Sequence, residues 1–150
     1  KEIRDQWDLT SVGRPSPDFK GQDINGKTLS LKDFNGKYLY IDVWATWCGP
    51  CKKEIPFLKE LEKKFEGKNI TFLSLSTDQD KTAWENMVKS GELSGTQLLI
   101  GRGSQFQKDY NINGIPHFIL LDPEGKIVNA SMIRPSSPDI EKVLNALPGI

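Results

Sequence analysis

The sequence is short of the residues that bind metals and of the long apolar runs that cross membranes. Its 150 residues contain two cysteines and one histidine, His117. A structural zinc site usually takes four such ligands, so the composition argues against one built by this chain alone. No run approaches the roughly 20 apolar residues of a membrane-spanning helix. Equal numbers of basic and acidic residues, 20 of each, leave no net charge to favour nucleic acid or an anionic membrane.

The length favours one domain with a core that needs no metal or disulfide to stabilise it. We therefore expect a single domain over residues 1–150, with an irregular, proline-containing surface segment at 1–17. The lysine-rich stretch 52–64 also contains Glu54, Glu60 and Glu62. We interpret this stretch as a solvated helix face rather than a polyanion-binding site.

Hydrophobic periodicity predicts strands that alternate with helices. The run Tyr38–Trp44 is β-branched and aromatic and predicts a central strand, in which Asp42 is the one charged residue. Further strands are expected at 18–23, 27–31, 70–76, 97–100, 117–121 and 126–130. Helices are expected at 31–34, 48–65, 81–90 and 104–110. This order predicts an α/β fold with a central mixed β-sheet and helices on both faces.

One more helix is expected near the C-terminus. Ser137 is a suitable N-cap for it, and Pro138 suits its first helical position. The expected buried stripe of this helix consists of Ile140, Val143, Leu144 and Leu147.

The two cysteines lie close together in the segment Cys48-Gly49-Pro50-Cys51, between the predicted central strand and the long helix. A disulfide that closes so short a loop adds little stability, so redox chemistry is the first interpretation. Free backbone N–H groups and the helix dipole favour a thiolate at Cys48. Gly49 leaves the sulfur uncovered, and Pro50 fits the first helical turn. Cys51 lies one turn further on, where we expect it to be more buried.

The residues around the cysteines resemble a known family. The run 42–52, DVWATWCGPCK, is similar to the active-site sequence of thioredoxins. Pro56 matches the proline that kinks the family's active-site helix, and Gly114-Ile115-Pro116 matches its cis-proline loop. Segments similar to the TlpA/ResA-like branch of the family are 17–19, 31–37, 51–56 and 70–90. The resemblance spans about residues 15–147.

The resemblance implies a thioredoxin fold with an extra N-terminal hairpin and an inserted strand–helix segment. It also implies thiol–disulfide exchange, in which Cys48 attacks and Cys51 resolves, leaving a Cys48–Cys51 disulfide. The Gly-Pro pair between the cysteines is more similar to reducing thioredoxins than to their oxidising relatives. We therefore expect a protein-disulfide reductase.

Partners and location also follow from the resemblance. It implies disulfide-containing substrate proteins and an upstream protein reductant, with no cofactor and no metal. The TlpA/ResA-like branch implies the bacterial periplasm or cell envelope, with any membrane tether outside this sequence. No signal peptide is recognisable, so the location rests on the resemblance alone. Cytochrome c maturation is a pathway that the branch suggests, and we expect a monomer.

Supporting roles are expected for several neighbours of the cysteines. Asp42 matches the buried acid of thioredoxins, where a raised pKa would let it accept the proton of Cys51. A hydrogen-bonded structural acid or a solvent-facing acid is the alternative, and some relatives in the branch use another acid near the motif. The Ile115–Pro116 bond is expected to be cis, with the backbone of Ile115 available to a bound peptide. The alternative is a trans proline that opens a strand.

The aromatic residues and the histidine are assigned in the same way. Trp47 is expected to be partly exposed beside the disulfide, and Trp44 to pack beneath it. Trp7 and Trp84 are expected to serve packing. His117 follows Pro116 and is interpreted as a hydrogen-bonded strand residue rather than a catalytic one, although its position would also allow it to tune Cys48.

Two other functions remain open at this point. A peroxidase of the peroxiredoxin type shares the general fold, but its cysteine lies in a loop rich in proline and threonine, whereas here the surrounding residues are Trp47, Gly49 and Pro50. A redox-sensing or binding domain of a larger envelope protein is the second alternative. The run 101–103, GRG, lacks the third glycine of a dinucleotide-binding loop.

Overall fold

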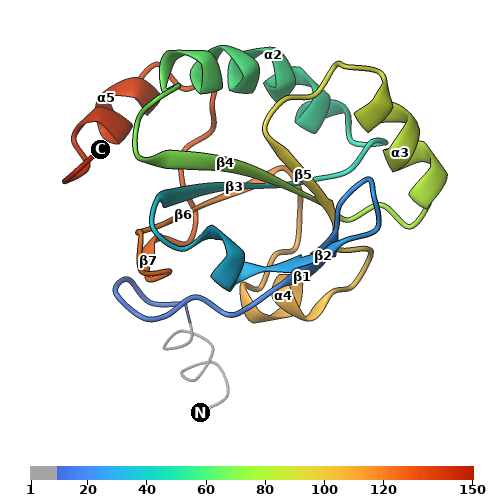
Figure 1. The fold of residues 1–150 in the computed structure, drawn as a ribbon, viewed down its shortest axis with the longest axis horizontal. Coiled ribbons are helices and arrows are strands. Elements are labelled where there is room, and N and C mark those ends of the chain that lie inside the picture. Colours follow the sequence, from blue (N-terminus) through green and yellow to red (C-terminus); the bar gives the residue numbers. More distant parts are fainter. Residues whose placement is uncertain (1–9) are drawn as a thin grey trace.

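A seven-stranded mixed sheet forms the centre of the molecule (Figure 1), in a computed structural model that describes residues 10–150. The strand order is β2-β1-β5-β4-β3-β6-β7. Strand β3 (Tyr38–Trp44) runs parallel to β4 (Ile70–Ser76) and antiparallel to β6 (His117–Leu121). The other strands are β1 (Lys20–Gln22), β2 (Thr28–Ser30), β5 (Thr96–Leu99) and β7 (Ile127–Asn129).

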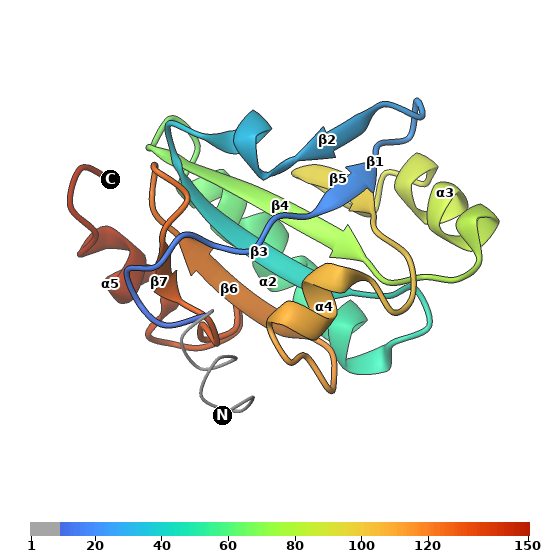
Figure 2. The ribbon, with the colours of Figure 1, turned by 90° about the horizontal axis from the view of Figure 1, so that it is seen from below.

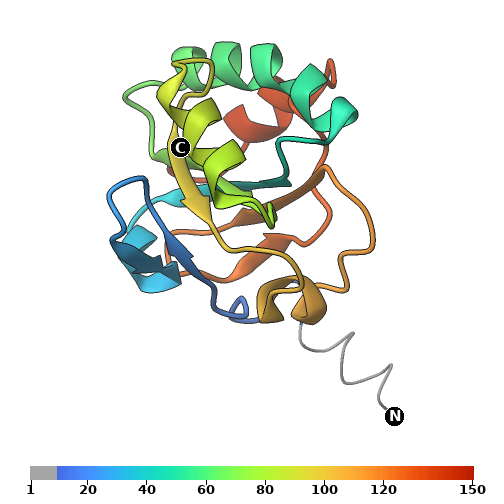
Figure 3. The same cartoon turned by 90° about the vertical axis from the view of Figure 1, so that its right-hand side faces the viewer.

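Helices cover both faces of this sheet, as the sequence predicts. Helices α2 (Gly49–Lys64), α3 (Lys81–Lys89) and α5 (Ile140–Asn145) lie on one side (Figures 1 and 3). The short helix α4 (Gln105–Asp109) and the 3-10 helix η1 (Leu31–Phe34) lie on the other. Figure 2 views this second side, with α4 in front of the sheet.

The alternation of side chains along β3 divides the core in two and decides which way its one acid points. Ile41 and Val43 belong to the cluster on the α4 side, whereas Tyr40 and Trp44 pack on the side of α2. Because successive strand residues point to opposite faces, Asp42 shares the α2 side with Tyr40 and Trp44. The sequence predicted the limits of β3 correctly, but only the packing assigns Asp42 to the α2 side.

The prediction for the last helix is wrong at its start and at one position of its buried stripe. Helix α5 begins at Ile140 with Asp139 as its N-cap. Ser137 lies in a preceding turn, where its N–H bonds to the carbonyl of Arg134 and its hydroxyl accepts the N–H of Asp139. Val143 is 38% exposed, whereas Ile140 and Leu144 are buried and Leu147 packs against the same core cluster.

The remaining predicted elements are present. The predicted limits at 31–34, 70–76 and 117–121 are correct, β5 lies one residue earlier than predicted, and the others are shorter at one or both ends. The turn between β1 and β2 contains Gly26 at a φ of 84°, a conformation that glycine adopts without steric cost. The loop at Asp122–Gly125 joins β6 to β7, which pair antiparallel. Trp7 and the first part of the predicted irregular segment lie outside the described residues. No helix within residues 10–150 is both long and apolar enough to span a bilayer.

Candidate active site

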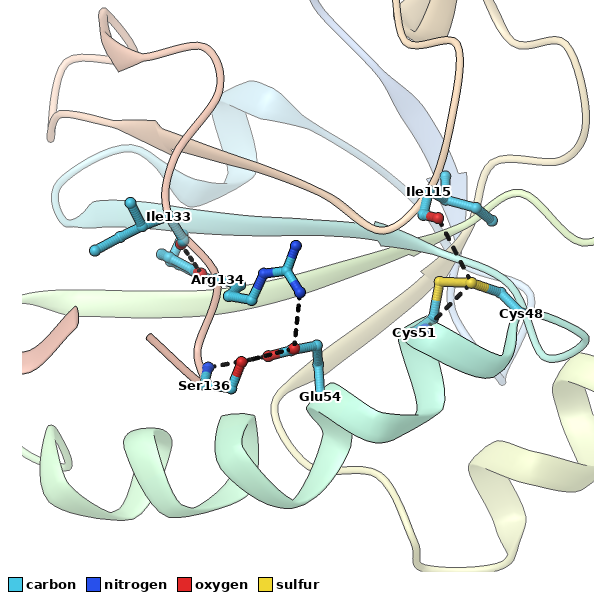
Figure 4. Close-up of polar contacts among 8 residues, drawn as sticks. Cys48, Cys51, Glu54, Ile115, Ile133, Arg134 and Ser136 are labelled. Carbon is cyan, nitrogen blue, oxygen red and sulfur yellow. Dashed lines mark hydrogen bonds and ion pairs between the residues drawn. A yellow bond between two sulfur atoms is a disulfide. The ribbon is translucent and has the colours of Figure 1, made fainter. Parts of the chain in front are cut away.

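Cys48 and Cys51 form a disulfide at the start of α2 (Figure 4). Cys48 is the N-cap of the helix, and its sulfur accepts the backbone N–H of Cys51 at 3.2 Å. The sulfur therefore takes the place of the oxygen that caps most helices. The two residues are buried alike, at 4% and 3% exposure. The expected contrast in burial is absent in this oxidised form, because the disulfide holds both sulfurs together.

The loop before β6 lies across from the disulfide. The carbonyl oxygen of Ile115 is 3.7 Å from the sulfur of Cys48 (Figure 4), although a disulfide sulfur has no proton to donate to it. The peptide bond between Ile115 and Pro116 is cis, as the resemblance led us to expect. Pro116 has no backbone N–H, so this loop turns a carbonyl rather than an N–H toward the sulfur.

The two tryptophans that flank the motif differ sharply in burial. Trp47 is 70% exposed beside Cys48, whereas Trp44 is buried in one cluster with both cysteines and Trp84. The disulfide therefore rests on aromatic side chains and has an exposed indole at its rim.

Asp42 is a buried carboxyl on the α2 side of the sheet. Burial, together with the negative charge of neighbouring Glu54, raises the pKa of Asp42 from its ordinary value of 3.8 to about 7. A hydrogen bond with Ser74 opposes part of this rise. At neutral pH the group can therefore both release and accept a proton, as a general acid or base must.

Glu54 is the main correction to the interpretation of 52–64 as a solvated face. It lies one turn beyond Cys51 and is buried, accepting the N–H and the hydroxyl of Ser136 at 3.0 and 2.8 Å (Figure 4). Arg134 lies 3.9 Å from the same carboxylate. The sequence carried a signal for this burial, because position 54 has helical spacing with Cys51 and Leu58. The other charged residues of the stretch 52–64 made this helical spacing hard to recognise.

His117 makes a hydrogen bond within the sheet region and belongs to no metal site among the described residues. The Nε2 atom of His117 lies 2.8 Å from the carbonyl of Ala130, which satisfies the ring as the sequence interpretation expects. Within residues 10–150, no three His, Cys, Asp or Glu side chains are grouped to hold a metal ion.

A second missed residue, Asp78, lies in the loop that follows β4. Its side chain is 2% exposed and accepts the N–H and the hydroxyl of Thr46, at 3.1 and 2.6 Å, and the hydroxyl of Ser76. The adjacent Thr77 donates its N–H to the carbonyl of Trp44 at 2.8 Å. The loop after β4 therefore fixes the turn that leads from β3 into Cys48.

Replacing Asp78 with asparagine is expected to lower the free energy of unfolding by about 1–3 kcal/mol, because an amide cannot accept all the donors that converge on the buried carboxylate. Urea unfolding of the oxidised protein measures this loss. Asp139→Asn is the matched control, since Asp139 is exposed and its side chain makes no cap hydrogen bond; its effect should stay within about 0.5 kcal/mol. Equal effects of the two changes would contradict the assigned role of Asp78.

The sequence of this chain matches a known protein family. Residues 11–147 match the family model described as Redoxin. The chain belongs to the Redoxin family. Two of its curated relatives are thiol-disulfide oxidoreductases named ResA. The one from Bacillus thuringiensis subsp. konkukian is 32% identical over 91% of this chain and 78% of its own length. The one from Bacillus subtilis is 32% identical over 79% of this chain and 65% of its own length.

Solved structures agree with this placement of the Redoxin-family chain. A Bacteroides vulgatus protein solved in solution and described as a thiol-disulfide oxidoreductase is 58% identical, with a TM-score of 0.79 over 89% of this chain and 88% of that one. The thioredoxin domain of another thiol-disulfide oxidoreductase from Bacteroides vulgatus is 34% identical, with a TM-score of 0.80 over 90% of this chain and 96% of that one.

These findings confirm the thioredoxin fold and the resemblance to the TlpA/ResA-like branch. The Redoxin-family chain is a thiol–disulfide oxidoreductase with the pair Cys48 and Cys51 in the expected place. The comparisons do not favour the peroxidase alternative.

Proposed function

We propose that this oxidoreductase reduces disulfides in substrate proteins. The thiolate of Cys48 attacks one sulfur of the substrate disulfide, so that a mixed disulfide forms and the other substrate sulfur leaves as a thiolate. The sulfur of Cys51 then attacks Cys48, releasing the second substrate sulfur. Two electrons pass from the dithiol to the substrate, and the Cys48–Cys51 disulfide remains. The observation that carries the choice of Cys48 as the attacking sulfur is its 3.2 Å contact with the N–H of Cys51, because this donor stabilises a thiolate. The Gly-Pro pair between the cysteines supports the reducing direction.

Asp42 is the proton acceptor in the proposed resolution step. Cys51 must lose its proton before it attacks. A carboxylate with a pKa of about 7 accepts that proton near neutral pH more readily than an ordinary aspartate, and it lies on the side of the sheet that α2 covers. Asp42 acts directly or through a water molecule.

The residues that flank the sulfurs are proposed to receive the substrate. The exposed indole of Trp47 contacts the partner, and the exposed Gly49 and Pro50 place no bulky side chain in the partner's way. The backbone of Ile115, held by Pro116, offers strand-like hydrogen bonds to the polypeptide on either side of the target cysteine.

The setting of the reaction also belongs to the proposal. The chain acts as one domain and as a monomer in the bacterial periplasm or cell envelope, and an upstream protein reductant restores the dithiol. Cytochrome c maturation is a pathway in which such a reductase would serve. Similarity to ResA proteins supports this setting.

Replacing Cys51 with serine is the direct test of the two-step scheme. The variant is expected to accumulate mixed disulfides with a disulfide-containing substrate such as insulin, because Cys48 attacks but nothing resolves. Non-reducing gels and mass spectrometry detect the adduct. The double variant Cys48→Ser/Cys51→Ser is the control and should form none. An adduct-free Cys51→Ser variant would rule out attack by Cys48, and a wild-type protein without a reversible two-electron couple would favour the sensor alternative.

A further inference from the structure

A cavity of about 550 Å³ opens beside the disulfide. Trp47, next to Cys48, and Ile115, whose carbonyl faces the sulfur of Cys48, both line it. Further lining comes from Thr77 and Gln79 after β4 and from Arg102 after β5. These residues belong to four loops, and the cavity that they line adjoins the reacting sulfur.

Among residues 10–150, Arg102 is the one charged residue that lines this cavity. Its guanidinium donates to the side-chain oxygen of Gln79 at 3.3 Å, which directs it toward the neighbouring loop. No carboxylate within residues 10–150 lies within ion-pair distance of it. The glycines on either side of Arg102, Gly101 and Gly103, have φ angles of 80° and 69°. Residues with side chains rarely adopt this left-handed conformation. The loop thus presents one unneutralised positive charge at the cavity.

The path of a substrate chain leads to this charge. A substrate cysteine bonded to Cys48 must lie near the backbone of Ile115, and Ile115 also lines the cavity. Residues close to the target cysteine in the substrate therefore reach the space between Trp47 and Arg102. The indole packs against the aliphatic part of a side chain there, while the guanidinium pairs with a carboxylate at its end.

We propose that this cavity receives the substrate residues that flank the target cysteine, and that Arg102 selects an acidic side chain among them. The inference rests on the proposed reduction of protein disulfides and specifies its substrate class. Arg102 is a specificity residue and takes no part in the exchange of sulfurs. Charge complementarity identifies the occupant as an acidic segment of polypeptide.

The test compares disulfide-linked peptide dimers in which the residue next to cysteine is Glu, Gln or Lys. For the wild-type protein, kcat/KM for the Glu dimer is expected to exceed that for the Gln dimer by about fivefold at about 0.01 M salt, and the preference should shrink at about 1 M salt. Arg102→Gln is expected to abolish the preference, and Arg102→Glu to turn it toward the Lys dimer. Lys108→Glu makes the same charge change at an exposed position of α4 that does not line the cavity, and it should keep the preference.

The Gln dimer separates the two hypotheses. Its reduction should proceed at a similar rate in the wild-type protein and in both Arg102 variants, and its failure in all of them would overturn the proposed reductase function instead. A wild-type protein with no preference for Glu, an unchanged preference in Arg102→Gln, or an equal loss in Lys108→Glu would each overturn the assignment of Arg102.

Discussion

Cys48→Ser is expected to reduce the catalysed rate of disulfide reduction to that of the uncatalysed exchange. A serine hydroxyl does not ionise near neutral pH and does not attack sulfur, so no mixed disulfide can form at this position. The substitution is close to isosteric, and serine is a good N-cap residue. The helix that begins there should therefore form as before. Insulin reduction, with a chemical dithiol to recycle the protein, measures the loss.

The variant must be shown to fold before its inactivity is interpreted. Far-ultraviolet circular dichroism and the urea midpoint of Cys48→Ser are compared with those of reduced wild-type protein, since the variant has no disulfide. A folded variant that retains wild-type turnover would show that Cys48 is not the attacking sulfur. Cys51→Ser has the same lack of a disulfide and is the matched control, because it should still react once.

Asp42→Asn is expected to stabilise the oxidised protein strongly at alkaline pH and much less in acid. The pKa of Asp42 is raised in the folded state from 3.8 to about 7, so its contribution to stability is fully present below about pH 4 and is lost as the pH rises through about 7. Between about pH 4 and about pH 8, ionisation of Asp42 is expected to lower the free energy of unfolding of the wild-type protein by about 4 kcal/mol. Asparagine does not ionise and removes this loss.

Urea unfolding at the two pH values measures the effect directly. The difference in unfolding free energy between Asp42→Asn and wild type should grow by about 4 kcal/mol from about pH 4 to about pH 8. Because the same difference is measured at both pH values, any pH-independent effect of the asparagine on stability cancels. The exposed substitution Asp139→Asn should show no such growth. A difference that stays constant with pH would mean that Asp42 titrates in the folded protein as it does in the unfolded chain.

The same variant should also be slow in resolution. In the proposed scheme the carboxylate of Asp42 accepts the proton of Cys51 during resolution, whereas the first attack by Cys48 does not use it. Rapid-quench measurements should therefore show normal formation of the mixed disulfide and its slow decay. Slow formation with normal decay would assign Asp42 a different role.

Local patterns in the sequence sufficed for the elements that build the site. The run 38–44 is apolar on both faces, which only a buried central strand accommodates, and the observed strand has those limits. The cysteines at a strand-to-helix junction were likewise identified from their neighbours. These features depend on residues close together in the chain, where periodicity and turn chemistry are reliable guides.

Features that depend on distant segments were missed. The charged neighbours of Glu54 indicate an exposed position. A serine on the loop before α5 instead donates two hydrogen bonds to its carboxylate, which offset the free-energy cost of burying it. Asp78 and Thr46 meet only because β3 and β4 are adjacent in the sheet. Arg102 lies near the disulfide only because four loops, distant in sequence, line one cavity. Patterns within a few consecutive residues cannot predict contacts between segments that are far apart in the sequence.

The central claim is that Cys48, at the N-terminus of α2, is the ionised sulfur that attacks. Alkylation of the fully reduced wild-type protein by iodoacetamide across a range of pH, with each cysteine quantified by mass spectrometry, tests it most directly. Cys48 should react before Cys51, and its rate should rise at a lower pH than that of glutathione under the same conditions. Faster reaction of Cys51, or a pH dependence of Cys48 that matches free glutathione, would contradict the account.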